Sequence, residues 1–183
     1  FLGMCRSLFA WATFERAKYI GAGTSLKFYI IEGVSPNDIT PLRVTTSAGD
    51  VTFAATNGSS TLTVTDTGHG AGKNDFVTFS DAATLGGNIT AAVLNQEYQV
   101  VSVSSANAFT ITAKDTDGST VTANSSDSGN GGSSTVGAYQ INTGLSDYVS
   151  ATGWGANPWG DNTWGSGAAL SVAGQLRMYS QDN

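Results

Sequence analysis

The sequence predicts an all-β protein, and three observations support this class. Only 12% of the 183 residues are charged, and Gly, Ser, Thr, Ala, Asn and Val dominate, which is typical of strands joined by many turns. Short apolar segments recur at regular intervals, separated by turns that contain Gly, Asn or Pro. Near the C-terminus, three Trp-Gly pairs with Pro158 among them argue against a helix.

The N-terminal part, residues 1–48, is expected to form an antiparallel meander. Its strand-like segments are residues 8–14, 17–23, 26–31 and 39–46. Residues 21–24 and 32–38 are the expected turns. Four such strands make one sheet of a sandwich or one propeller blade. A single four-stranded sheet leaves an apolar face uncovered, so it needs a further partner.

The next block, residues 49–113, is expected to be a small closed β-barrel inserted after the meander. Asn57–Ser60 (NGSS) predicts a hairpin turn, and later strands are expected at residues 76–79, 89–94, 97–103 and 108–113. A change of side-chain parity predicts a bulge at residues 100–101. Strand alternation predicts a core that includes Phe53, Leu62, Val64, Val77, Tyr98, Val100, Phe109 and Ile111.

A polar, Gly/Ser-rich segment follows at residues 114–135. We expect a hairpin turn at Asp117-Gly118 and an exposed, mobile loop over Asn124–Thr135. Residues 136–183 are expected to return to the meander sheet as a β segment.

The candidate interaction or packing aromatics are Trp154, Trp159 and Trp164, each followed by Gly. An indole carries a large apolar body and one N–H donor, so a row of them favours a partner surface. That partner is either the rest of this protein or another subunit or ligand. We expect burial against neighbouring β structure, because three exposed rings would form a large apolar patch.

The barrel block resembles a small β-barrel found in structural proteins of tailed phages, which is related to the first catalytic-cysteine half-domain fold of ubiquitin-activating enzymes. The matching segments are residues 67–70 (TGHG), 75–79 (DFVTF), 98–100 (YQV) and 107–111 (NAFTI). Asn74 and Gln96 stand where that pattern has Gly.

Nearly the whole chain resembles the tail tubular protein B, tail nozzle or DNA-stabilisation proteins of short-tailed bacteriophages. The segments are residues 8–11 (LFAW), 19–24 (YIGAGT), 26–29 (LKFY), 38–43 (DITPLR), the Trp-Gly ladder and 176–183 (LRMYSQDN). The resemblance implies propeller blades with inserted barrels, and a homo-oligomeric ring below the portal. Since the chain holds about one blade and opens on Phe1, we expect it to be a fragment of a larger β-propeller protein.

Composition and single residues argue against several other functions. A net charge of −6 and a pI near 4.4 argue against a nucleic-acid-binding surface. His69 is the only histidine and Cys5 the only cysteine, so a catalytic triad has one possible base and a Cys-based zinc site is excluded. Asp115–Gly118 is better explained as a turn than as a calcium loop. The uncharged run Ser7–Phe14 is too short to span a membrane.

The sequence therefore predicts a non-enzymatic virion protein without cofactor or metal, located in the tail of a short-tailed phage. It would assemble with itself and with other tail or portal proteins, and would serve host attachment and DNA ejection by letting DNA pass without specific binding. The alternative is a carbohydrate-binding or adhesin module in which the Trp-Gly array stacks on sugar rings, with Asn157, Asp161 and Asn162 lying between the indoles.

Overall fold

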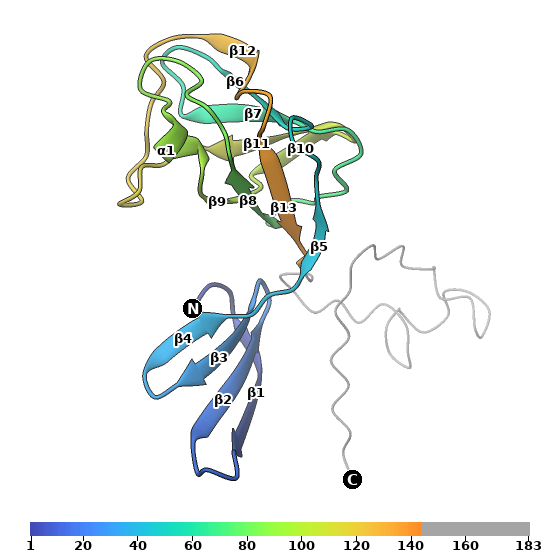
Figure 1. Ribbon diagram of the computed structural model, residues 1–183, viewed down its shortest axis with the longest axis vertical. Coiled ribbons are helices and arrows are strands. Elements are labelled where there is room, and N and C mark those ends of the chain that lie inside the picture. Colours follow the sequence, from blue (N-terminus) through green and yellow to red (C-terminus); the bar gives the residue numbers. More distant parts are fainter. Residues whose placement is uncertain (144–183) are drawn as a thin grey trace, which may run out of the picture.

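The computed structural model describes residues 1–143, and in this part the protein is all-β with one short helix. Figure 1 shows two bodies: an N-terminal sheet below and a larger body above. The larger body contains a five-stranded and a four-stranded sheet. Every strand pair among the described residues is antiparallel. The predicted fold class is confirmed.

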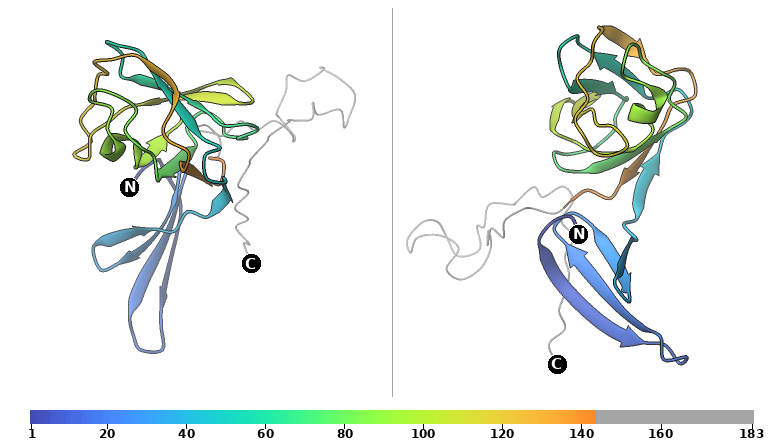
Figure 2. Two further views of the ribbon diagram at one scale, coloured as in Figure 1. Left: turned by 45° about the horizontal axis from the view of Figure 1, so that its top comes forward. Right: turned by 90° about the vertical axis from the view of Figure 1, so that its left-hand side faces the viewer.

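The N-terminal sheet is a meander in which each strand pairs with the next along the chain. Its strands are β1 (Cys5–Ala12), β2 (Lys18–Thr24), β3 (Phe28–Glu32) and β4 (Ser35–Asp38). Arg16, at a φ of 64°, helps to close the turn between β1 and β2. The β1–β2 hairpin reaches furthest from the larger body in both views of Figure 2.

The fourth strand of this sheet differs from the one predicted. Gly33 has a φ of 62°, a conformation that favours glycine and closes a tight turn. The chain therefore reverses early, and the segment expected as a turn forms β4. Pro36 is tolerated there because β4 is an edge strand. The expected strand at residues 39–46 instead supplies β5 (Leu42–Thr45), which pairs with β13 (Val136–Gln140) in the larger body.

The larger body packs two sheets around one core. The five-stranded sheet has the order β10 (Ser102–Ser105), β11 (Ala108–Thr112), β7 (Thr61–Thr65), β6 (Thr52–Ala55) and β12 (Asp127–Asn130). The four-stranded sheet has the order β5, β13, β8 (Phe76–Ser80) and β9 (Glu97–Gln99). Strands that are far apart in sequence lie side by side in both sheets.

The closed barrel expected over residues 49–113 is wrong, because the described strands form two separate ladders. The chain changes sheets between Val100 and Val101. The amide of Val100 donates to the carbonyl of Asp75 at 2.8 Å, whereas that of Val101 donates to the carbonyl of Thr110 at 2.9 Å. At residues 100–101, where a bulge was expected, the chain therefore passes from one sheet to the other. β5 and β13, from outside the predicted barrel block, complete the second sheet.

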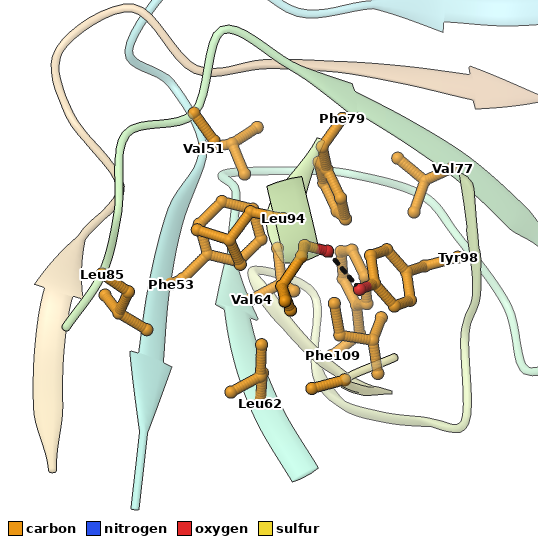
Figure 3. Packing of buried hydrophobic residues seen from close by; sticks show 14 of the residues in the cluster. Val51, Phe53, Leu62, Val64, Val77, Phe79, Leu85, Leu94, Tyr98 and Phe109 are labelled. Atoms are coloured by element: carbon orange, nitrogen blue, oxygen red, sulfur yellow. Dashed lines mark hydrogen bonds between the residues drawn. The ribbon is translucent and has the colours of Figure 1, made fainter. Parts of the chain in front are cut away.

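The core prediction is confirmed for all eight residues. Phe53, Leu62, Val64, Val77, Tyr98, Val100, Phe109 and Ile111 are each at most 2% exposed. Figure 3 shows most of them converging from both sheets. Phe79 and Leu94, which the pattern did not single out, complete the packing at 1% and 0% exposure. Burying each large side chain contributes about 1.5–3 kcal/mol.

The strand expected at residues 89–94 is wrong: α1 (Ala91–Leu94) is a single helical turn. Thr90 caps it, because its hydroxyl accepts a hydrogen bond from the amide of Val93 at 3.3 Å. The hydroxyl of Tyr98 donates to the carbonyl of Val93, which fastens the helix to β9 (Figure 3).

Part of the exposed loop expected over Asn124–Thr135 is instead a strand, since β12 pairs with β6 within it. The segment is anchored by backbone pairing and by glycine. A Cβ atom at Gly131 would lie 2.8 Å from Cδ2 of Phe53. Thr135 is fully buried, and its hydroxyl donates to the carbonyl of Gly131 at 2.6 Å.

Candidate interaction surface

A row of aromatic rings lies on one face of the N-terminal sheet. Trp11 pairs directly with Tyr19 across β1 and β2, and Phe9 is two residues from Trp11, so all three share a face. The ring centroids of Phe9 and Trp11 are 6.0 Å apart and those of Trp11 and Tyr19 are 5.7 Å apart, each pair inclined by 23°. Phe9 is 69% exposed and Trp11 36% exposed. The row is therefore open to solvent in the described part of the chain.

Glycine on β2 leaves room for the indole of Trp11. A Cβ atom at Gly21 would lie 3.3 Å from Cζ3 of Trp11, so the ring leans over this position. The hydroxyl of Tyr19 lies 3.4 Å from Oε1 of Glu32 on the next strand. Both contacts set the orientation of the row.

The register between the four strands defines this side, which we call the aromatic face. Its members are Ser7, Phe9, Trp11, Tyr19, Gly21, Gly23, Phe28, Ile30, Glu32, Ser35 and Asn37. Glu32 is the only charged residue among these strand positions. Phe9 and Trp11 are the large apolar side chains that this face exposes, and exposed aromatic rings in a row are typical of a surface that packs against a partner.

A buried lysine fixes the sheet to the larger body. The Nζ atom of Lys27 lies 2.6 Å from Oδ2 of Asp38 and 2.5 Å from Oε1 of Glu97 on β9. It also lies 4.6 Å from the ring centroid of Phe76, and Lys27 is only 3% exposed. The aromatic face therefore has a defined position relative to the body.

The surroundings of Lys27 and Asp38 favour the charged form of each side chain. Burial lowers the pKa of Lys27, but hydrogen bonds to Asp38 and Glu97 outweigh it and raise the pKa above its ordinary value. Burial likewise opposes ionisation of Asp38, yet hydrogen bonds from Lys27 and Thr40 hold its pKa below the ordinary value. Gln140 donates to the same oxygen of Glu97 at 2.8 Å.

The opposite side of the sheet is partly covered by the first residues of the chain. The rings of Phe1 and Tyr29 meet edge to face at 5.0 Å, and the amide of Leu2 donates to the hydroxyl of Tyr29 at 3.1 Å. Tyr29 is accordingly only 7% exposed.

His69, the one candidate base, is fixed in a turn of the larger body. Its Nδ1 accepts from the amide of Ala71 at 3.0 Å, and its Nε2 lies 3.2 Å from the carbonyl of Ser105. These partners assign the neutral tautomer with the proton on Nε2. The ring is 4% exposed and packs on Phe109 at 4.9 Å, which is the arrangement of a structural histidine.

A second buried polar cluster joins the two sheets of the body. The hydroxyl of Tyr139 donates to Oδ2 of Asp66 at 2.7 Å, and both residues are at most 4% exposed. Burial, with the hydrogen bond to Asp66, raises the pKa of Tyr139 far above its ordinary value. The guanidinium of Arg43 lies over the Tyr139 ring at 5.7 Å and donates to the carbonyl of His69 at 2.7 Å.

The remaining sequence candidates are not brought together. Cys5 is exposed at the start of β1. Asp115–Gly118 forms the expected turn, in which the amide of Gly118 donates to the carbonyl of Asp115 at 2.9 Å. Within residues 1–143, no group of three or more metal-ligating side chains occurs, and no helix has the length and hydropathy needed to cross a membrane.

Trp154, Trp159 and Trp164 lie outside the described residues. The structure instead reveals the row of Phe9, Trp11 and Tyr19, which the sequence analysis did not select as a site. The signal was available: two aromatic residues separated by one position in a strand share a face, and their strand is followed by a glycine-rich one.

Comparison with known proteins adds little to this description. The chain matches no protein-family model and no curated protein. Among solved structures, it is similar to the phage phi92 endosialidase, with a TM-score of 0.38 and 19% sequence identity. The match covers 67% of this chain and 16% of the endosialidase chain.

Proposed function

We propose that this protein is a structural component of the tail of a short-tailed bacteriophage and acts by assembling with copies of itself into a ring. The observation that carries the proposal is the exposed aromatic face of the N-terminal sheet. Phe9 and Trp11 lie on β1, which is an edge strand in the described part of the chain, and both side chains are exposed there. Assembly would remove this apolar surface from water.

The segments that resemble tail tubular protein B and nozzle proteins support the same proposal. In such a ring, a net charge of −6 disfavours binding of DNA phosphates, so DNA can pass without being held. Other tail or portal proteins would then contact the outer surfaces of the ring.

A carbohydrate-binding or adhesin module is the second candidate, and the aromatic row favours it independently of the Trp-Gly segment. Neighbouring rings inclined by only 23° could stack on consecutive sugars. Glu32 and Asn37, on the same face, could supply hydrogen bonds. This function uses one face of the sheet and requires no self-assembly.

Two measurements separate these candidates. Antibodies raised against the chain should label the tail in purified particles of the phage that encodes it, and negative-stain images of the concentrated chain should show rings. Binding to a glycan array that is lost in Trp11→Ala, with no labelling of particle tails, would reject the structural function in favour of the adhesin.

A further inference from the structure

The reverse side of the N-terminal sheet also exposes apolar residues. Leu8 is 66% exposed and Ile20 40% exposed, and both lie on the side opposite Phe9 because strand residues alternate. The register gives this back face the members Leu8, Ala10, Ala12, Lys18, Ile20, Ala22, Tyr29, Ile31, Pro36 and Asp38. Phe1 and Leu2 already cover Tyr29 at one end of this face, and a ligand on the aromatic face would leave Leu8 and Ile20 uncovered.

The two faces carry opposite charges at the same end of the sheet. Glu32 on the aromatic face pairs with Tyr19, and Lys18, the neighbour of Tyr19, lies on the back face opposite Ala12. The other charged residue of the back face, Asp38, is engaged by Lys27. Stacking two copies of the sheet in the same orientation would therefore place Glu32 of one near Lys18 of the next.

We propose that the aromatic face of each copy packs on the back face of the same sheet in a neighbouring copy. Each such contact would then join the four-stranded sheets of two neighbouring copies. This inference rests on the proposed function, because it assigns the contact by which the ring forms. Such a front-to-back contact uses two different surfaces, so it repeats around an axis and can close into a ring.

Three features of the sheet favour a second copy as the occupant. The meander order β1-β2-β3-β4 is the strand order of a propeller blade, which packs on identical blades face to face. Chains with a net charge of −6 repel one another, so contact is easiest where side chains are mostly uncharged. Glu32 and Lys18 add an attraction that only the front-to-back order provides.

The area of the N-terminal sheet sets the expected strength of the contact between two copies. β1 has eight residues, which span about 27 Å at 3.4 Å per residue, and four strands cover roughly 20 Å across. Since β2, β3 and β4 are shorter than β1, the face covers about 400 Å², below the roughly 800 Å² per partner of a standard interface. One contact alone is therefore weak, and closing a ring strengthens assembly because each copy makes two contacts.

A charge exchange tests the arrangement directly. Sedimentation velocity of the 183-residue chain over a range of concentrations gives the concentration of half-assembly. Glu32→Lys and Lys18→Glu should each raise this concentration about fivefold or more, because each brings like charges together. The double variant Glu32→Lys/Lys18→Glu should return it to the wild-type value. Urea titration of each variant checks that the monomer fold is unchanged.

Neutral substitutions add a matched control. Phe9→Thr on the aromatic face and Ile20→Thr on the back face should each weaken assembly about tenfold or more. Val101→Thr should leave assembly unchanged, because Val101 lies between β9 and β10 in the larger body. Val101 is likewise an exposed apolar residue, at 46%.

The outcomes distinguish this inference from the function on which it rests. If the chain assembles but the charge exchange does not restore the single variants, the front-to-back contact is wrong and the structural function stands. Assembly that is unaffected by every one of these substitutions leads to the same conclusion. If the chain stays monomeric at every concentration, both the contact and the ring fail.

Discussion

The indole of Trp11 leans over Gly21 on the neighbouring strand, and a Cβ atom at Gly21 would lie 3.3 Å from its Cζ3. This separation is tighter than ordinary van der Waals contact, so the ring must shift if a methyl group is added. The orientation of the Trp11 ring on the aromatic face therefore depends on the absence of a side chain at Gly21.

Gly21→Ala should displace the Trp11 ring while leaving the fold intact. Alanine removes some backbone freedom of the unfolded chain, which offsets the steric cost, so stability should change by less than about 1 kcal/mol. Incorporation of 5-fluorotryptophan gives one ¹⁹F resonance per indole, and Trp11→Phe identifies that of Trp11. The resonance should move in Gly21→Ala and stay in place in Ala10→Ser, a small change on the opposite face.

Lys27→Met should destabilise the protein by about 1–3 kcal/mol. Removing Lys27 leaves the carboxylates of Asp38 and Glu97 close together without their shared cation. Hydrogen bonds from Thr40 and Gln140 remain, and both carboxylate side chains are about a third exposed, so the cost stays below that of a fully buried pair. Urea unfolding measures the change. Lys73→Met, at an exposed position, should alter stability by less than about 0.5 kcal/mol, a typical limit for surface changes. Equal losses of stability in Lys27→Met and Lys73→Met would show that the ion pairs of Lys27 do not stabilise the fold.

The stabilisation by Lys27 should depend on pH at both extremes. The pKa of Asp38 is lowered from 3.8 in the folded protein, so its contribution is present above that value and disappears as pH falls through the folded pKa. The pKa of Lys27 is raised from 10.5, so its contribution is present below that value and disappears as pH rises through the folded pKa. The stability difference between wild type and Lys27→Met should shrink at both acid and alkaline pH. A difference that does not change with pH would contradict a stabilising role of the ion pairs of Lys27.

Tyr139→Phe should cost about 1–3 kcal/mol, because it leaves the buried carboxylate of Asp66 without its hydroxyl donor. Tyr19→Phe removes the same atom from a tyrosine whose partner, Glu32, is exposed, and should cost less than about 0.5 kcal/mol. Thermal or urea unfolding compares the two at neutral pH. If Tyr139→Phe lost no more stability than Tyr19→Phe, the buried hydrogen bond between Tyr139 and Asp66 would not contribute to the stability of the fold.

The core and many of the strands followed from the sequence because both depend on local alternation. Leu62 and Val64, or Phe109 and Ile111, share a parity within one strand and are bounded by turn residues, so burial of that face could be predicted without knowing the partner strand. The turn at Asp117-Gly118 followed in the same way from its residue types.

What the sequence did not reveal depends on long-range pairing. β5 pairs with β13 and β12 pairs with β6, and nothing local marks a strand as belonging to a distant partner. The helix α1 replaces an expected strand because Thr90 supplies a cap and residues 91–94 fit one turn. The aromatic row requires the register of Trp11 against Tyr19, which alternation within one strand cannot fix.

The central claim is that the N-terminal sheet is an assembly surface, and the molar mass of the chain in solution tests it most directly. Multi-angle light scattering at concentrations from a few to several hundred micromolar should show the mass rising from 18.8 kDa to a defined multiple of that value. Phe9→Thr should shift this rise to higher concentration. A mass that stays at 18.8 kDa throughout would contradict the account.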